Sequence, residues 1–158
     1  MKNKLWLNKE KLLSVEKEIV KIKLNLLDEE FLFNNDIFTL EYIKELHIFL
    51  FGDLYYEEDL TFRELSKEEI KYIKNLFNSI KEACISDDNV EMLLESLVKF
   101  WELQIFKDGN TRTLLGYLSI LNKAFILNLD IDLNKEIKSR PSELYDKKVN
   151  QKRLTKQK

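Results

Sequence analysis

A chain of 158 residues is long enough for one domain with a single core and too short for two. Hydrophobic residues make up 44% of it and charged residues 34%, a balance typical of a folded, soluble domain and not of a disordered chain. Three glycines and one proline are too few turn formers for a fold of many strands, so we expect helices.

The formal charge of −2 is distributed unevenly along the chain. Residues 147–158 hold six Lys or Arg and no acid, which leaves about −8 for residues 1–146. We assign residues 1–146 to one domain and predict a disordered basic tail over 147–158. Because no helix of the domain presents a basic stripe, nucleic acid is not the expected partner.

Export signals, membrane spans and disulfides are all absent from the sequence pattern. Cys84 is the only cysteine, which excludes an internal disulfide and a cysteine-rich metal site. The basic start is not followed by an apolar run of signal-peptide length, and no window approaches the roughly 18 apolar residues that a membrane span needs. We therefore expect a cytoplasmic protein that does not contact the membrane.

Apolar residues at helical spacing predict the first two helices. The first runs from about Asn8 to Leu27, and turn residues predict a loop over 28–38. Thr39 can cap the second helix, whose apolar side carries His47, the only histidine. That position favours a hydrogen-bonded packing role for His47 over catalysis or zinc binding.

Capping residues and apolar stripes predict the later helices. Ser66 to Glu69 is a capping box for a helix that carries Cys84 on its apolar face, where we expect a buried, unreactive thiol. Asp88 with Glu91 offers a second capping box, followed by the cleanest apolar stripe over 90–101. The helix over 114–125 is apolar on nearly all sides, as central helices are. Residues 127–133 alternate apolar and polar, but without a partner strand we interpret them as a connector.

A polar turn separates the last two of these helices, in the stretch Gln-Ile-Phe-Lys-Asp-Gly-Asn-Thr-Arg-Thr-Leu-Leu-Gly from Gln104 to Gly116. Gly109 permits a positive φ, which would put the next three amides at the N-terminus of the following helix. Such amides and the helix dipole favour phosphate. Arg112 would add a guanidinium group, and Asp108 a carboxylate able to hold Mg²⁺ beside phosphate oxygens. The turn therefore predicts a nucleotide-phosphate site, although an isolated Asp-Gly-Asn can also be a simple helix cap.

The same stretch resembles the signature of the Fic (Fic/Doc) family, His-Pro-Phe-x-Asp/Glu-Gly-Asn-Gly-Arg-Thr-x-Arg. The matching positions are Phe106, Asp108, Gly109, Asn110, Arg112 and Thr113, and the departures are Gln104, Ile105, Thr111 and Leu115. Residues 46–55, Leu-His-Ile-Phe-Leu-Phe-Gly-Asp-Leu-Tyr, resemble a second block of the family, Ile-His-x-x-Leu-Phe-x-Asp-Ile-Tyr. After Tyr55 the chain lacks the family's Trp-Ala-Gly and the residues of its β-hairpin flap, which holds a target segment.

The resemblance implies an all-α Fic-like bundle with a phosphate-binding loop between two central helices and a reduced or absent flap. The family mostly transfers AMP from ATP to a hydroxyl of a target protein, so the implied cofactors are ATP and Mg²⁺, with Asp108 at the metal. The implied nucleotide-binding positions are Asp108, Gly109, Asn110, Thr111, Arg112 and Thr113. Gln104 stands at the catalytic histidine and cannot act as a base, since an amide has no usable proton affinity near neutral pH. Leu115 removes the second arginine.

We therefore expect a catalytically impaired relative of the protein adenylyltransferases that binds a nucleotide, a target protein or an antitoxin-like partner. Two alternatives stay open: an active transferase with an altered mechanism, and an interaction module that no longer binds nucleotide. Many family members are silenced by a Ser/Thr-x-x-x-Glu helix whose Glu pairs with the second arginine. We do not assign that element to the loose matches Ser14 to Glu18 and Ser139 to Glu143, because Leu115 offers the carboxylate no partner.

Overall fold

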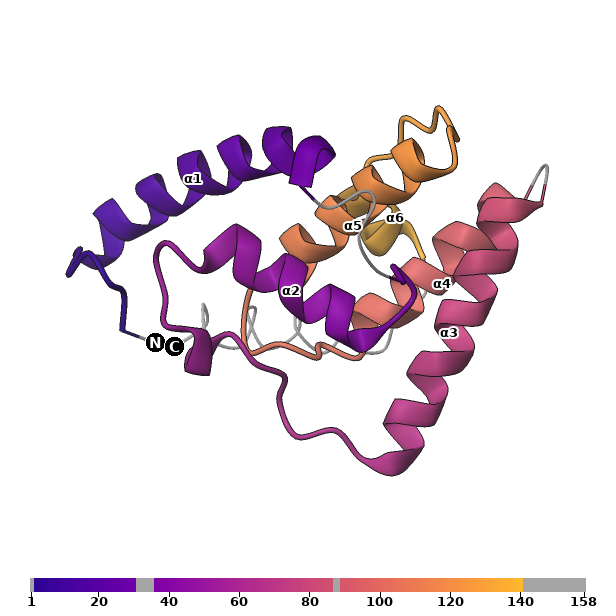
Figure 1. Ribbon diagram of the computed structural model, residues 1–158, viewed down its shortest axis with the longest axis horizontal. Coiled ribbons are helices and arrows are strands. Elements are labelled where there is room, and N and C mark those ends of the chain that lie inside the picture. The colour runs from indigo at the N-terminus through magenta and orange to yellow at the C-terminus, as the bar shows by residue number, and fades with distance from the viewer. Residues whose placement is uncertain (1, 31–35, 87–88, 141–158) are drawn as a thin grey trace, which may run out of the picture.

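The computed structural model describes residues 2–30, 36–86 and 89–140, and within these ranges the chain is helical (Figure 1). The elements are α1 (Lys9–Glu30), α2 (Leu40–Phe51), the 3₁₀ helix η1 (Glu57–Asp59), α3 (Lys67–Ile85), α4 (Val90–Glu102), α5 (Asn110–Ala124) and α6 (Leu133–Ser139). The only β pairing among these residues is two isolated bridges. The expected all-α class is confirmed for the described part of the chain, where no helix has the length and apolarity to cross a membrane.

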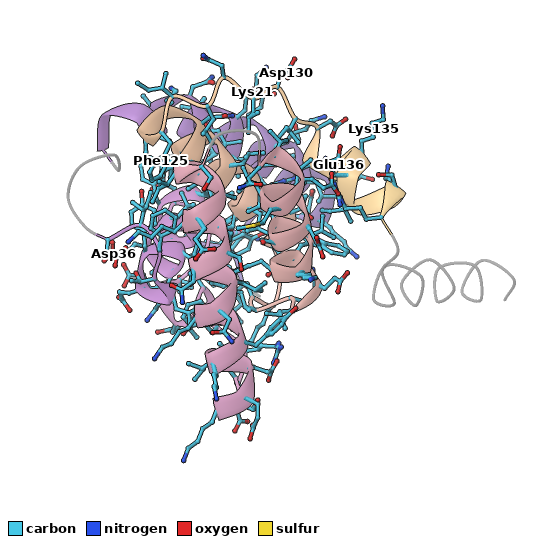
Figure 2. The ribbon with its side chains drawn as sticks, turned by 90° about the vertical axis from the view of Figure 1, so that its right-hand side faces the viewer. Lys21, Asp36, Phe125, Asp130, Lys135 and Glu136 are labelled. Carbon is cyan, nitrogen blue, oxygen red and sulfur yellow. The ribbon has the colours of Figure 1, made fainter. Side chains whose placement is uncertain are left out.

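Helix α5 lies at the centre of the arrangement. It contacts α1, α2, α4 and α6, while α3 packs along α4 on the far side from α1 (Figure 1). A view turned by 90° shows α3 at the front beside α4, with Phe125 toward the left and Lys135 and Glu136 of α6 toward the right (Figure 2). The central place predicted for the helix over 114–125 is therefore correct, and the loop that precedes it is held between several helices.

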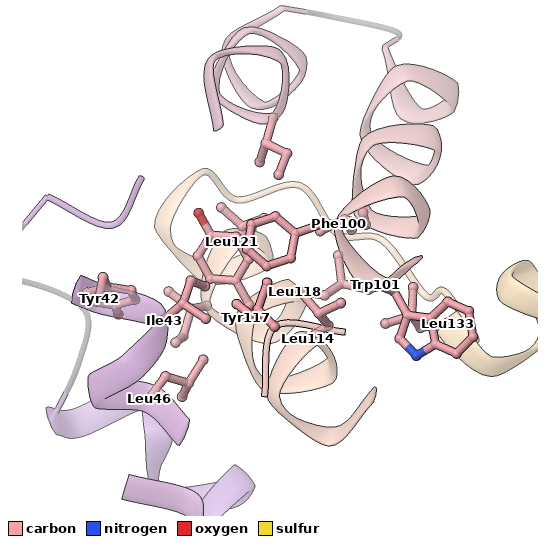
Figure 3. Close-up of a cluster of buried hydrophobic side chains, with 14 of the residues drawn as sticks. Tyr42, Ile43, Leu46, Phe100, Trp101, Leu114, Tyr117, Leu118, Leu121 and Leu133 are labelled. Carbon is pink, nitrogen blue, oxygen red and sulfur yellow. The ribbon is translucent and has the colours of Figure 1, made fainter. Parts of the chain in front are cut away.

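The core forms where three helices meet. Tyr117 of α5 is fully buried between Ile43 of α2 and Phe100 of α4 (Figure 3). Its hydroxyl donates to the carbonyl of Ile37 at 2.7 Å, so the buried polar atom is satisfied. Each fully buried side chain of this size contributes roughly 1.5–3 kcal/mol by leaving water. Cys84 also belongs to this core, where burial raises the pKa of its thiol to about 11, as expected for an unreactive cysteine.

Most of the predicted helix starts are confirmed at the level of single hydrogen bonds. The Thr39 side chain accepts from the Tyr42 amide, and Ser66 and Glu69 form the reciprocal capping box. The predicted box at Asp88 lies outside the described residues, and α4 has Asn89 as an N-cap without a side-chain hydrogen bond. Helix α1 continues to Glu30, beyond the predicted end, and residues 31–35 of the predicted loop lie outside the described residues.

The alternating residues after α5 form a connector, as predicted. The amide side chain of Asn122 donates to the carbonyl of Leu129 at 2.9 Å and accepts from its amide at 3.0 Å. These two bonds satisfy the backbone groups that a partner strand would otherwise pair. Asp132 then caps α6 by accepting from the Lys135 amide. The predicted basic tail over 147–158 lies outside the described residues.

The chain between α2 and α3 contains η1 and no named strand. It runs along the lower side of the molecule in Figure 1, and its β pairing with the α4–α5 loop is limited to one isolated antiparallel bridge, Phe62 to Phe106. A hairpin flap is therefore absent from the described residues of this segment, as the sequence predicts.

Candidate functional site

The loop between α4 and α5 depends on a glycine at its turn. Gly109 has φ +78°, a left-handed conformation that side-chain-bearing residues rarely adopt. A Cβ atom there would lie 2.7 Å from Cε2 of Phe51 and 3.1 Å from Cε1 of His47. Both the backbone conformation and the close approach of α2 therefore require glycine. Helix α5 begins at the next residue, Asn110, so the predicted amides do lie at a helix N-terminus.

The inner face of the loop is tied down by Asn110 and Thr113. Asn110 is 8% exposed. Its side-chain Oδ1 accepts from the backbone N–H of Phe106 at 3.0 Å, and its Nδ2 donates to the backbone carbonyl of Phe106 at 2.9 Å. The Thr113 hydroxyl donates to the Gly109 carbonyl at 2.8 Å. Thr113 is 1% exposed and lies beneath the loop, whereas the prediction placed it against the nucleotide. These bonds fix the path of the turn from below.

His47 supports the loop from α2. Its Nδ1 lies 2.8 Å from Thr113 Oγ1, and because that hydroxyl proton goes to Gly109, Nδ1 is the donor. The ring stacks on Phe106, with centroids 3.7 Å apart and an interplanar angle of 9°. Burial lowers the pKa of His47 to about 4, so the ring is neutral at pH 7. The predicted packing role is confirmed.

Gln104, which the resemblance aligns with the catalytic histidine of the Fic signature, closes the end of α4. It has a positive φ of 47°, and its Nε2 donates to the Trp101 carbonyl at 2.8 Å. Its Oε1 accepts from Asn110 Nδ2 at 3.3 Å. The Gln104 amide therefore links the helix end to the loop, and it also borders the cleft outside it.

A cleft of about 350 Å³ opens on the outer face of the loop. Its residues come from α1, the end of α4, the loop and the start of α5, and they are Leu13, Glu16, Trp101, Gln104, Lys107, Asp108, Gly109, Asn110, Thr111 and Arg112. The N-cap residue Gly109 supplies no side-chain bond to the first amides of α5. Five of the six predicted nucleotide-binding residues thus border one cleft, and Thr113 is the exception.

Charges of both signs line this cleft. Arg112 Nη1 lies 2.6 Å from Glu16 Oε1, and the Tyr55 hydroxyl donates to Glu16 Oε2 at 2.6 Å. The side chain of Glu16 is only 13% exposed. Burial and the bond to Glu16 raise the pKa of Tyr55 well above its usual value, so the phenol keeps its proton. Arg112 is therefore an ion-pair partner of α1 in this structure and not an unengaged phosphate ligand.

Sequence reasoning did not assign Glu16, Tyr55 or Lys107 to the site. A usable signal existed in α1, because Glu16 falls at helical spacing from Leu12, Ile19 and Val20, on the stripe that packs inward. A carboxylate on such a stripe needs a partner. Ser14 and Glu18, the loose match to the inhibitory motif, are exposed, as expected for helix surface, and Glu143 of the other match lies outside the described residues.

Two further predicted positions have clear places in the structure. Asp108 is exposed at the cleft rim, where its Oδ1 accepts from the Gly109 amide at 2.8 Å. Among the described residues no cluster of three or more His, Cys, Asp or Glu side chains could hold a metal ion, so a metal at Asp108 would need ligand oxygens too. Leu115 is half-buried and packs against the core.

Comparison with known protein sequences identifies no relative, so the function is inferred from the geometry of the cleft. A scan against models of protein families gave no match, and a search of curated protein sequences gave none either.

Proposed function

We propose that this chain is a Fic-like relative of the protein adenylyltransferases that binds nucleotide phosphate at the α4–α5 loop and is catalytically impaired. The observation that carries the proposal is the cleft at the N-terminus of α5, which is bordered by Lys107, Asp108 and Arg112. A helix N-terminus without a side-chain cap favours an anion, and the two cations add to that preference. Its volume of about 350 Å³ lies within the range of small-molecule sites.

ATP with Mg²⁺ fits these residues on one condition. The α5 amides and Arg112 would hold phosphate, and Asp108 would hold Mg²⁺ together with phosphate oxygens. The Glu16 carboxylate already lies against Arg112 at 2.6 Å, so a phosphate at Arg112 would have to compete with it. Binding is therefore expected to be weaker than the loop alone would give.

Catalytic impairment follows from the chemistry of Gln104, which stands where the Fic signature has its base, and of His47, the only histidine. Gln104 carries an amide, and its two hydrogen bonds hold the loop. The His47 ring is buried beneath the loop and is bonded to Thr113. A positioned base typically contributes ~10²–10⁴-fold to rate, and neither residue would supply it.

A transferase with an altered mechanism is the second candidate, and one observation favours it. The carboxylates of Glu16 and Asp108 border the same cleft as Gln104, so either could take a proton from a hydroxyl bound there. A third possibility is an interaction module that binds no nucleotide. In that case the ion pair between Glu16 and Arg112 would persist in the cleft.

Isothermal titration with ATP and Mg²⁺ tests the binding proposal. Arg112→Ala is expected to abolish binding, since it removes a bidentate donor, and Asp108→Ala to remove its Mg²⁺ dependence. Arg140→Ala is the matched control, because Arg140 also forms ion pairs, with Glu91 of α4 and Glu136 of α6. Equal affinity in the wild type and Arg112→Ala would show that the loop is only a helix cap.

Transfer of labelled AMP to lysate proteins separates the impaired protein from the active one. The wild type should give no transfer, and Gln104→His should give a little, more in the double variant with Leu115→Arg. The gain is limited because Gln104→His removes the two hydrogen bonds that the side-chain amide of Gln104 forms. In addition, the guanidinium group introduced by Leu115→Arg must extend from a half-buried position to the cleft. Robust transfer by the wild type would favour the second candidate.

A further inference from the structure

The segment before α3 is joined to the loop through Arg63. Phe62 forms an isolated antiparallel bridge with Phe106, and the Arg63 amide donates to the Ile105 carbonyl at 2.8 Å. The rings of Phe62 and Phe106 are 5.2 Å apart at their centroids. Phe106 in turn stacks on His47, so the segment, the loop and α2 form one continuous contact.

The guanidinium group of Arg63 covers the end of α4. Its Nη2 donates to the Leu103 carbonyl at 2.9 Å, and its Nε lies 3.2 Å from the carbonyls of both Leu103 and Gln104. The other side of the group forms an ion pair with Glu69. A helix C-terminus presents unpaired carbonyls and partial negative charge, which a cation stabilises. Arg63 therefore connects the end of α4 with the capping box of α3.

The loop needs such a support because its first residue is strained. Gln104 has a φ of 47°, a left-handed conformation that a non-glycine residue keeps only where its surroundings hold it. The side-chain amide of Gln104 also accepts a hydrogen bond from Asn110, the residue whose side chain fixes the path of the loop. A change in the backbone conformation of Gln104 would therefore shift Asn110 and, with it, the backbone amides at the start of α5.

We infer that Arg63 is a positioning residue for the cleft: it fixes the backbone of Leu103 and Gln104, and through them the α4–α5 loop, in the geometry that binds ligand. It contacts the Leu103 carbonyl and is not among the residues that line the cleft. The effect on ligand rests on the proposed function, whereas the effect on the loop backbone does not. Glu69 supports the role by orienting the guanidinium group.

Hydrogen exchange on the full-length chain tests the positioning role directly. In Arg63→Ala the amides of Gln104 and Phe106 should exchange at least about tenfold faster, because several charged hydrogen bonds are lost, while the amides in the middle of α5 should change little. Arg63→Lys should be intermediate, since an ammonium group cannot reproduce the planar fork. Glu69→Gln should have the smallest effect, because glutamine keeps the capping box and Arg63 keeps its carbonyl partners. Unchanged exchange at Gln104 and Phe106 in Arg63→Ala would overturn the inference.

Titration with ATP and Mg²⁺ supplies the second readout. Arg63→Ala should raise Kd by about tenfold at a temperature where it is fully folded. Arg140→Ala, which removes the arginine that follows α6, should leave both Kd and loop exchange unchanged. A wild-type protein that does not bind ATP refutes the proposed function alone, and the exchange experiment then still decides the role of Arg63. Faster loop exchange with unchanged affinity would show that Arg63 stabilises the loop without positioning the site.

Discussion

The two faces of the α4–α5 loop differ in burial and in the kind of contact that their side chains make. On the inner face, Asn110 and Thr113 are buried and hydrogen-bonded, and no buried side-chain polar atom of the described residues lacks a partner. On the outer face, Lys107 and Asp108 are exposed, and Arg112 pairs with a carboxylate from a distant helix. Packing alone explains why the inner residues have their identities. Only the outer residues carry information about a ligand.

This difference changes the weight of the resemblance to the Fic signature. Phe106, Gly109, Asn110 and Thr113 match the signature, and each has a structural task in building the turn. A loop that had lost every ligand would still need them. The case for phosphate therefore rests on the α5 amides, Asp108 and Arg112, and predictions that separate the two faces are the most informative.

The largest expected effect is on the inner face, in Gly109→Ala. The new Cβ would meet Phe51 at 2.7 Å and force a left-handed conformation on alanine, so we expect a loss of roughly 2–4 kcal/mol in the free energy of unfolding. Urea denaturation measures it. Gly116→Ala is the control, because its Cβ would meet only side-chain atoms of Leu24, Leu27 and Leu46, at 3.2–3.6 Å. Equal losses in the two variants would contradict a special role for Gly109.

The next largest effect is the pH dependence that His47 gives to the inner face. Burial lowers its pKa to about 4, below the usual 6.5, so the unfolded chain binds a proton that the folded chain excludes. Stability from this group is complete above pH 6.5 and falls as the pH drops toward 4, by about 3 kcal/mol in total. Urea denaturation of the wild type and His47→Gln across that range isolates the contribution, since the carboxylates are common to both. Parallel pH profiles would show that His47 titrates normally.

Several features of the inner face could be predicted from the sequence because the signals for them are local. A glycine before a polar helix start, a histidine on an apolar stripe and the Ser66 capping box are each visible in a few neighbouring residues of the sequence. The partners that they meet in the fold are not: His47 contacts Thr113, 66 residues away. Helix periodicity likewise gave the central place of α5. The predicted end of α1 and the predicted N-cap of α4 were less accurate. The exact end of a helix depends on several local hydrogen bonds of similar strength, and the sequence does not show which of them forms.

The outer face could not be predicted in the same way, since its decisive contacts join distant parts of the chain. Glu16 and Arg112 are 96 residues apart, and Arg63 reaches carbonyls 40 and 41 residues away. Backbone carbonyls carry no sequence signal, so the task of Arg63 is invisible before folding. The position of Glu16 on an apolar stripe predicts that it has a partner but not which one.

The smallest expected effect, and the sharpest test of the outer face, is in Glu16→Gln. Removing the negative charge frees Arg112 from an ion pair, while the amide can still accept from the Tyr55 hydroxyl. Affinity for ATP with Mg²⁺ should rise by roughly 3- to 10-fold, which corresponds to about 0.7–1.4 kcal/mol. The same charge is removed by Glu18→Gln, but from an exposed position on the same helix, so that variant should bind like the wild type.

Each outcome of the Glu16 comparison has a distinct physical meaning. A rise in both variants would reflect only the change in overall charge, and salt would suppress it in both alike. A fall in Glu16→Gln alone would mean that Glu16 orients Arg112 toward the cleft and does not compete with the ligand. A rise confined to Glu16→Gln would locate the competition at the 2.6 Å contact between Glu16 and Arg112, and would make α1 the element that sets the affinity of the cleft.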